Sequence, residues 1–85
     1  MAITMLRNPA VWKRRGKSRS SHYADISAGL FVKPVQIGPR AVATPDYEVD
    51  QLIVATVAGK SDEEKRQLVR KLESARVHAE TEVQP

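Results

Sequence analysis

Residues 8–31 read NPAVWKRRGKSRSSHYADISAGLF, and the helix-starting and helix-ending residues in this stretch decide the fold. Asn8 is a favoured N-cap, and Pro9 suits the first position of a helix, where its missing N–H group is not needed. Gly16 is expected to end this first helix in a left-handed conformation, and Ser18 to cap a second one. Two short helices with so short a break between them have the spacing of a helix-turn-helix.

The second helix is expected to begin at Ser18, to end at Gly29 and to be the recognition helix. Tyr23 and Ile26 lie three residues apart and can share a buried face. Recognition helices usually contact base edges with side chains of their first turn. The side chains available in this turn are Arg19, Ser20, Ser21 and His22.

Several polar residues of this helix also have an alternative role. Ser18 and Ser21 can simply cap the helix, and capping is the favoured role for Ser18. Asp25 could accept a hydrogen bond from a cytosine amino group, or it could orient Arg19. His22 does not indicate a metal site, because no cluster of potential ligands surrounds it in the sequence.

Residues 31–44 read FVKPVQIGPRAVAT and change to an alternation with a period of two. Gly38 and Pro39 interrupt it, so the stretch predicts a small β-hairpin with these two residues at its tip. Pro34 cannot occupy a central strand, so both strands are expected to be short edge strands. A hairpin after a recognition helix is typical of a winged helix, and Arg40 beside the tip suits a contact with a phosphate or the minor groove. A salt bridge from Arg40 to an acid of the following helix is the alternative.

A third helix is expected after the hairpin. Thr44, Pro45 and Asp46 repeat the pattern of a cap, a proline and an acid that favours a helix N-terminus. Gly59 is expected to end this helix. Apolar residues follow one another at helical spacing between these signals, and we expect all of them in the core. They are Val49, Leu52, Ile53 and Val57.

The remaining chain is expected to form one more helix. Ser61 and Glu64 have the spacing of a capping box, and the helical pattern continues to about Ala79. The apolar stripe of this helix is too narrow to be stable alone in water. The helix therefore packs either on the body of its own domain or on a partner, which would be a second copy or another protein. Residues 81–85 are expected to fray. The stripe consists of Leu68, Leu72, Ala75 and Ala79.

Basic charge is concentrated in the first half of the chain. Residues 1–45 carry eight basic residues and one acid, a net charge of +7, whereas residues 46–85 carry six basic and nine acidic residues, a net charge of −3. This asymmetry suits a surface that meets a polyanion such as DNA. The chain has no cysteine, which excludes disulfides and thiolate metal sites, and no uncharged stretch long enough to span a bilayer. We therefore expect a soluble, cytoplasmic protein.

Other classes of function find less support in the sequence. No paired carboxylates lie in an apolar setting, no nucleophile has an obvious base, and no cofactor loop is recognisable, so we expect neither an enzyme nor a bound cofactor or metal. Single-stranded RNA binding normally needs exposed aromatic side chains, whereas the aromatic residues here fall mainly on core-facing positions. The main alternative to duplex DNA binding is a protein-interaction adaptor that uses the C-terminal helix and binds nucleic acid only non-specifically.

Three stretches together carry a family resemblance: residues 16–23 (GKSRSSHY), 29–43 (GLFVKPVQIGPRAVA) and 48–50 (EVD). They resemble the AlpA family of small prophage-type transcriptional regulators, which are related to phage excisionases and to the MerR-like winged helix. The resemblance covers residues 5–58. It implies that residues 18–28 are the recognition helix and that residues 33–43 are the wing, with Arg40 as its basic tip. Lys17 replaces the family's common leucine.

We therefore predict a winged helix-turn-helix protein that binds specific sequences in double-stranded DNA, as a prophage-type transcriptional regulator or an excisionase-like recombination factor at the bacterial nucleoid. Residues 1–58 would form the DNA-binding domain and residues 59–85 a C-terminal helical extension. One winged helix contacts few base pairs, so we expect a homodimer or cooperative binding at repeated sites. The residues predicted to contact DNA are Lys13, Arg14, Arg15, Lys17, Ser18, Arg19, Ser20, Ser21, His22, Lys33 and Arg40.

Overall fold

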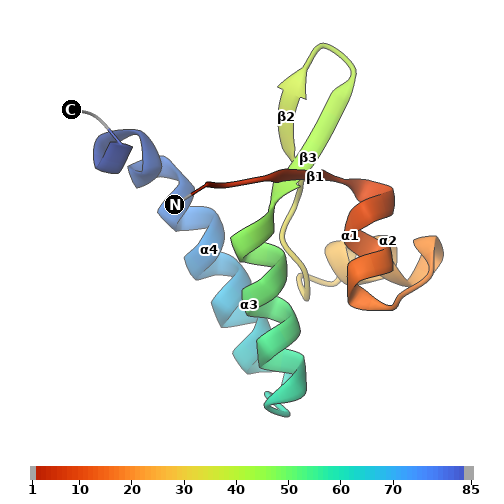
Figure 1. Cartoon of the computed structure of the whole chain (residues 1–85). Coiled ribbons are helices and arrows are strands. Elements are labelled where there is room, and N and C mark those ends of the chain that lie inside the picture. Colours follow the sequence, from red (N-terminus) through yellow and green to blue (C-terminus); the bar gives the residue numbers. More distant parts are fainter. Residues whose placement is uncertain (1, 84–85) are drawn as a thin grey trace.

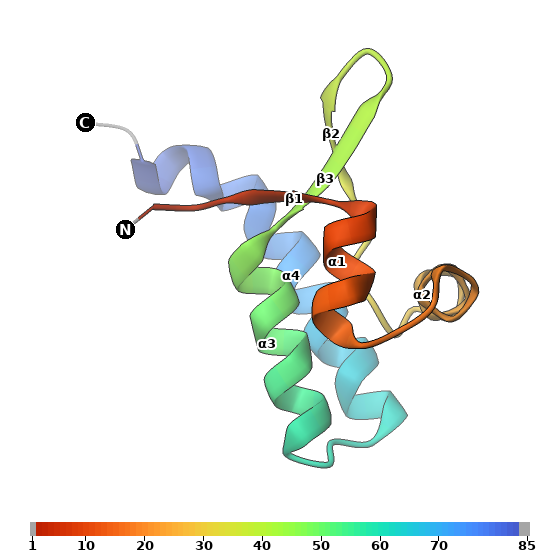
Figure 2. The ribbon, with the colours of Figure 1, turned by 45° about the vertical axis from the view of Figure 1, so that its right-hand side comes forward.

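The elements follow one another in the order expected for a winged helix-turn-helix, with one strand added at the start (Figure 1). The computed structural model describes residues 2–83. In this described part of the chain four helices form the body, and the β2–β3 hairpin of a small antiparallel sheet projects away from them (Figure 2). The predicted fold class, mainly helical with a hairpin wing, is confirmed. The elements are β1 (Met5–Arg7), α1 (Asn8–Arg15), α2 (Arg19–Ser27), β2 (Val35–Gly38), β3 (Ala41–Pro45), α3 (Asp46–Val57) and α4 (Asp62–Val83).

Helices α1 and α2 form the predicted helix-turn-helix. Gly16 follows α1 with a left-handed φ of 71°, and the Ser18 side chain caps α2 by accepting a backbone N–H three residues on, at 3.2 Å. The predicted cap of α1 is wrong, because Asn8 is already helical and Arg7 precedes the helix without a side-chain cap. The Asn8 side chain instead donates from Nδ2 to Tyr23 Oη of α2 at 3.1 Å.

The sheet contains a strand that the sequence pattern does not predict. β1 has only three residues, too few to show an alternation, and it pairs antiparallel with β3. β3 is therefore the central strand in the order β1-β3-β2, and the expectation of two edge strands is wrong for β3. The predicted hairpin is present, but its turn lies one residue later than predicted, because Gly38 is still the last residue of β2. Val35 lies opposite Ala43, and a register irregularity at Gly38 leads into the turn at Pro39 and Arg40.

Helix α3 begins one residue later than predicted, at Asp46. Thr44 is buried in β3 and is not the cap of the helix, and Pro45 takes that position without a side-chain hydrogen bond. The backbone N–H of Asp46 instead donates to the carbonyl of Thr4 at 2.9 Å, which ties the start of α3 to the N-terminal segment. Gly59, with a φ of 73°, follows the end of α3 as predicted.

The core lies where α1, α3, α4 and the segment after α2 meet. α4 contributes two side chains to it, so this helix packs on the other helices of the same chain. Two residues predicted in the core are exposed. One is Val57, at 83%, and the other is Tyr23, whose core-facing position in α2 is taken by His22. The buried apolar residues of the core are Val11, Phe31, Val32, Val49, Leu52, Val69 and Leu72.

Helix α4 begins with the predicted capping box. The Ser61 N–H donates to Glu64 Oε1 at 3.0 Å, and the Glu64 N–H donates to Ser61 Oγ at 3.2 Å. The helix continues to Val83, past the residue at which its sequence pattern ends, so the predicted fraying is wrong for residues 81–83. The side chain of Ala79 and residues 84–85, which belong to the predicted stripe and the predicted frayed tail, lie outside the described part of the chain.

Helix α4 also holds the segment that joins α2 to the hairpin. Glu73 accepts a hydrogen bond from the backbone N–H of Lys33, and Arg76 donates to the carbonyl of the same residue, both at 2.8 Å. Arg66 donates to the carbonyl at the C-cap of α2 at 3.0 Å. Arg76 also forms two hydrogen bonds with Glu48 of α3, which is completely buried. The position of the hairpin relative to α2 therefore depends on α4.

Candidate nucleic-acid interface

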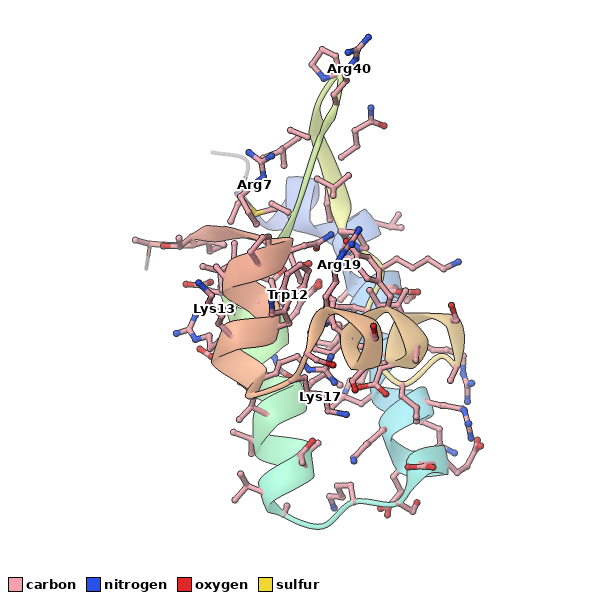
Figure 3. The ribbon with its side chains drawn as sticks, turned by 90° about the vertical axis from the view of Figure 1, so that its right-hand side faces the viewer. Arg7, Trp12, Lys13, Lys17, Arg19 and Arg40 are labelled. Atoms are coloured by element: carbon pink, nitrogen blue, oxygen red, sulfur yellow. The ribbon has the colours of Figure 1, made fainter. Side chains whose placement is uncertain are left out.

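One face of the molecule gathers basic side chains from four elements (Figure 3). Arg7 lies at the end of β1, and Lys13 lies on α1. Arg19 stands in the first turn of α2, and Arg40 in the turn of the hairpin. All four are exposed, and within the described chain none of them forms an ion pair, including the salt bridge to α3 considered for Arg40. We call these four residues the basic face, and their charges are available to phosphates.

The first turn of α2 presents polar groups beside these cations. Arg19 and Ser20 are exposed, and their side chains form no hydrogen bond to another described residue. The Arg19 guanidinium lies over the ring of Tyr23, 5.6 Å from its centroid, and this contact favours one position of the charge. Ser18 Oγ accepts the Ser21 N–H and donates to Ser21 Oγ at 3.1 Å, so both hydroxyls are engaged in the cap.

Of the residues predicted to contact DNA, His22 is buried and Arg15 is mostly buried. His22 is 1% exposed and packs edge-on against Phe31, with the ring centroids 5.1 Å apart. Arg15 lies over the same Phe31 ring at 4.0 Å, donates to His22 Nδ1 at 2.8 Å and pairs with Asp25 at 2.6 Å. Asp25 is likewise turned toward Arg15 and Lys17, from which it accepts hydrogen bonds. The Arg15 and His22 side chains therefore join α1 to α2, and the structure does not favour their predicted contacts with DNA.

In this cluster the pKa values of both His22 and Asp25 are lowered. Burial lowers the pKa of His22 below the ordinary 6.5, and the neighbouring charge of Arg15 lowers it further, whereas Asp25 acts in the opposite direction. Burial raises the pKa of Asp25, but hydrogen bonds from Lys17 and Arg15 outweigh it and bring the pKa below the ordinary 3.8. At neutral pH His22 is therefore uncharged. Its Nδ1 accepts from Arg15, since a guanidinium can only donate.

We expect the stability of the protein to fall as the pH is lowered through 6.5. The folded protein disfavours protonated His22, so below that pH the unfolded chain binds more protons than the folded one, and the loss continues down to the lowered pKa of the folded state. Urea unfolding at a series of pH values measures it. His22→Gln should flatten this dependence. An unchanged slope in His22→Gln would contradict the assignment.

The remaining predicted contacts lie beside the basic face or away from it. Arg14 pairs with Asp50 of α3 at 3.3 Å, and Lys17 pairs with Asp25 at 2.7 Å, although both side chains stay partly exposed. The Lys33 side chain is also exposed, but it lines a hollow shared with α4. Arg14 and Lys17 are held by ion pairs, and Lys33 faces the hollow that it shares with α4. These three side chains are therefore less well placed to contact a phosphate than the four residues of the basic face.

Arg7 is the member of the basic face that the sequence analysis does not select. It belongs to β1, which is too short to be recognised from its pattern, so no predicted element places it. The sequence could still have placed Arg7 beside α1, because it directly precedes Asn8, where the helix is predicted to start, and the residue before a helix lies beside that helix's first turn.

Two further features of the described chain bear on the class of site. None of its helices combines the length and the apolar character that crossing a membrane requires. Residues 2–77, whose side chains are described, contain no group of three or more His, Cys, Asp or Glu side chains that could hold a metal ion.

One family of known proteins matches this architecture in sequence. The sequence model of the family described as "Prophage CP4-57 regulatory protein (AlpA)" matches residues 4–56. The match covers more than half of the chain, spans β1 to most of α3, and ends before α4. Comparisons with curated proteins and with solved structures give no significant match.

Proposed function

Because this chain belongs to the AlpA family of prophage regulatory proteins, which are DNA-binding regulators, we propose that it binds specific sequences in double-stranded DNA. The basic face is the observation that carries the proposal. Its cations come from four elements, with Arg19 in the first turn of α2, Arg7 and Lys13 to one side of it and Arg40 at the distant hairpin tip (Figure 3). A helix-turn-helix directs this end of its second helix at base edges in the major groove.

On this proposal, α2 enters the major groove, which is about 12 Å wide and admits one helix. Arg19 suits bidentate hydrogen bonding to guanine, and Ser20 can bond to several bases. Arg40 at the hairpin tip would contact a neighbouring phosphate or the minor groove, while Arg7 and Lys13 would contact the backbone that α1 crosses. Once bound at its site, the protein would recruit or exclude other proteins and would bend the DNA.

The proposed role is that of a transcriptional regulator or of an excisionase-like recombination factor, since both need the same surface. Residues 1–58 would contact the DNA, and residues 59–85 would hold that part in shape through Lys33. The two roles differ in where the bound sequence lies, at a promoter or at a recombination site. Mapping the bound sites in a host genome would distinguish them.

Selection from randomised duplexes, at low and near-physiological salt, tests the proposal. We expect one enriched motif and, with about four phosphates contacted, a fall of log K against log salt with a slope of about −4. Arg40→Ala should reduce that slope by about 1 and leave the motif unchanged. Arg70→Ala, an exposed arginine of α4 that pairs with Glu63, is the matched control and should change neither. If no duplex is retained at either salt concentration, the proposal is wrong.

A further inference from the structure

The outward face of α3 is more apolar than a solvent-facing helix surface usually is. Its residues recur three or four positions apart, on the side opposite the buried Val49 and Leu52. Val54 is 64% exposed and Val57 83% exposed. We call this surface the α3 stripe, and it consists of Tyr47, Asp50, Gln51, Val54, Val57 and Ala58.

Shallow apolar hollows lie at both ends of the α3 stripe. Ile3 and Tyr47 line the hollow at the N-terminal end. Val54, Ala58 and Leu68 of α4 line the hollow at the C-terminal end. The exposed apolar surface therefore continues from α3 onto its neighbours at both ends. A contiguous surface of this kind marks an interaction site.

The two ends of the stripe carry opposite charges. At the first end, Asp50 pairs with Arg14 at 3.3 Å, and at the second end Lys60 lies 3.8 Å from Glu64. Both pairs are exposed, so they are weak and can rearrange. After these ion pairs are counted, one negative charge is left unneutralised at the first end and one positive charge at the second end. Asp46 and Asp50 give the acidic end its sign, and Lys60 and Lys71 give the basic end its sign, with Asp50 also bordering the hollow at the C-terminal end.

We propose that the α3 stripe is a two-fold symmetric interface between two copies of this chain. A two-fold interface uses the same patch on both subunits, so that patch must complement itself. When two α3 helices pack antiparallel, the acidic end of each meets the basic end of the other. The apolar middle of the stripe becomes buried, with Val54 of each copy near the symmetry axis.

This arrangement leaves the basic faces of both copies on the same side. In the lower half of Figure 3, which looks onto the basic face, α3 lies to the left and α4 to the right. The stripe faces away from the core that α3 shares with α4. A half-turn about the line of sight therefore places a second copy at the left edge, with its α3 reversed and its basic face still toward the viewer. Dimerisation itself needs no DNA, so its test is independent of the proposed function.

Sedimentation equilibrium of the full chain, over a concentration series without DNA, tests the proposal. The wild-type chain should form a reversible dimer. Val54→Glu should weaken the dimer by about tenfold or more, because it places two like charges near the axis. Val77→Glu is the matched control, since Val77 is a 77% exposed residue of α4 outside the stripe, and it should leave the dimer unchanged. Circular dichroism verifies that both variants are folded.

Charge reversal tests the antiparallel arrangement. Asp46→Lys and Lys60→Asp should each weaken the dimer, because each puts like charges at the contacting ends. The double variant should dimerise more strongly than either single variant. A wild-type chain that stays monomeric over the whole series would overturn the proposal. Equal dimerisation of Val54→Glu and Val77→Glu, or a double variant no stronger than the single ones, would overturn it too.

Discussion

Replacing Arg76 by methionine should lower the free energy of unfolding by about 3–5 kcal/mol, because it leaves the Glu48 carboxylate buried without its partner. Glu48 is completely buried, and its two oxygens accept from Arg76 Nε at 2.9 Å and Nη2 at 2.5 Å. These hydrogen bonds raise the pKa of Arg76 above its ordinary value, so the arginine stays charged. The same change removes the bond to the Lys33 carbonyl. Since small domains are stable by only about 5–15 kcal/mol, much of the total would be lost.

Urea unfolding followed by circular dichroism measures this loss. Arg70→Met on the same helix is the matched control, because it removes an exposed pair with Glu63 at 3.5 Å and should cost less than about 1 kcal/mol. Adding Glu48→Gln to Arg76→Met should recover part of the loss, since the buried group left behind is then uncharged. Equal losses in Arg76→Met and Arg70→Met would show that the buried pair does not hold α4 in place.

Arg19→Ala should weaken binding to the selected duplex by about 1–3 kcal/mol and should relax the preference at one position of the motif. Arg19 is exposed in the first turn of α2, forms no ion pair in the described chain and is held over the ring of Tyr23. A guanidinium in this position can make two hydrogen bonds to a single guanine. Titration of the selected duplex, and of duplexes changed at one position each, measures both effects.

Lys13→Ala is the matched control for this prediction. Lys13 lies on α1 in the same basic face, where it is expected to contact only the backbone (Figure 3). Its loss should therefore weaken binding to all duplexes about equally and leave the motif unchanged. If Arg19→Ala also weakened all duplexes equally, Arg19 would be a phosphate contact and another side chain of α2 would have to select the sequence.

The parts of the fold that the sequence predicts are those fixed by local interactions. Gly16, Ser18 and Gly59 act within a few residues of their own position, so the helix ends they mark agree with the structure. The hairpin tip at Pro39 is local in the same way. β1 is not predictable in this manner, because its three residues pair only with β3, which lies far along the chain. The same pairing makes β3 a central strand.

The candidate site is predicted less well, because it depends on which polar residues face inward. Arg15 and His22 hydrogen-bond each other and enclose Phe31, and buried polar groups of this kind cannot be recognised from a pattern of apolar residues. Arg19 and Arg40 are exposed as predicted, since the first turn of a helix and the tip of a hairpin face solvent in most orientations of those elements. Their contacts with DNA stay predictions.

The attachment of α4 to Lys33 also bears on when a newly made chain becomes able to bind. Synthesis adds about 5–20 residues per second, starting at the N-terminus. Lys33 is made first, and its partners Glu73 and Arg76 follow 40 and 43 residues later. For that interval of about 2–9 seconds, α2 and the hairpin exist without the helix that fixes their relative position. Each nascent chain therefore acquires its working geometry only after these residues of α4 have been made.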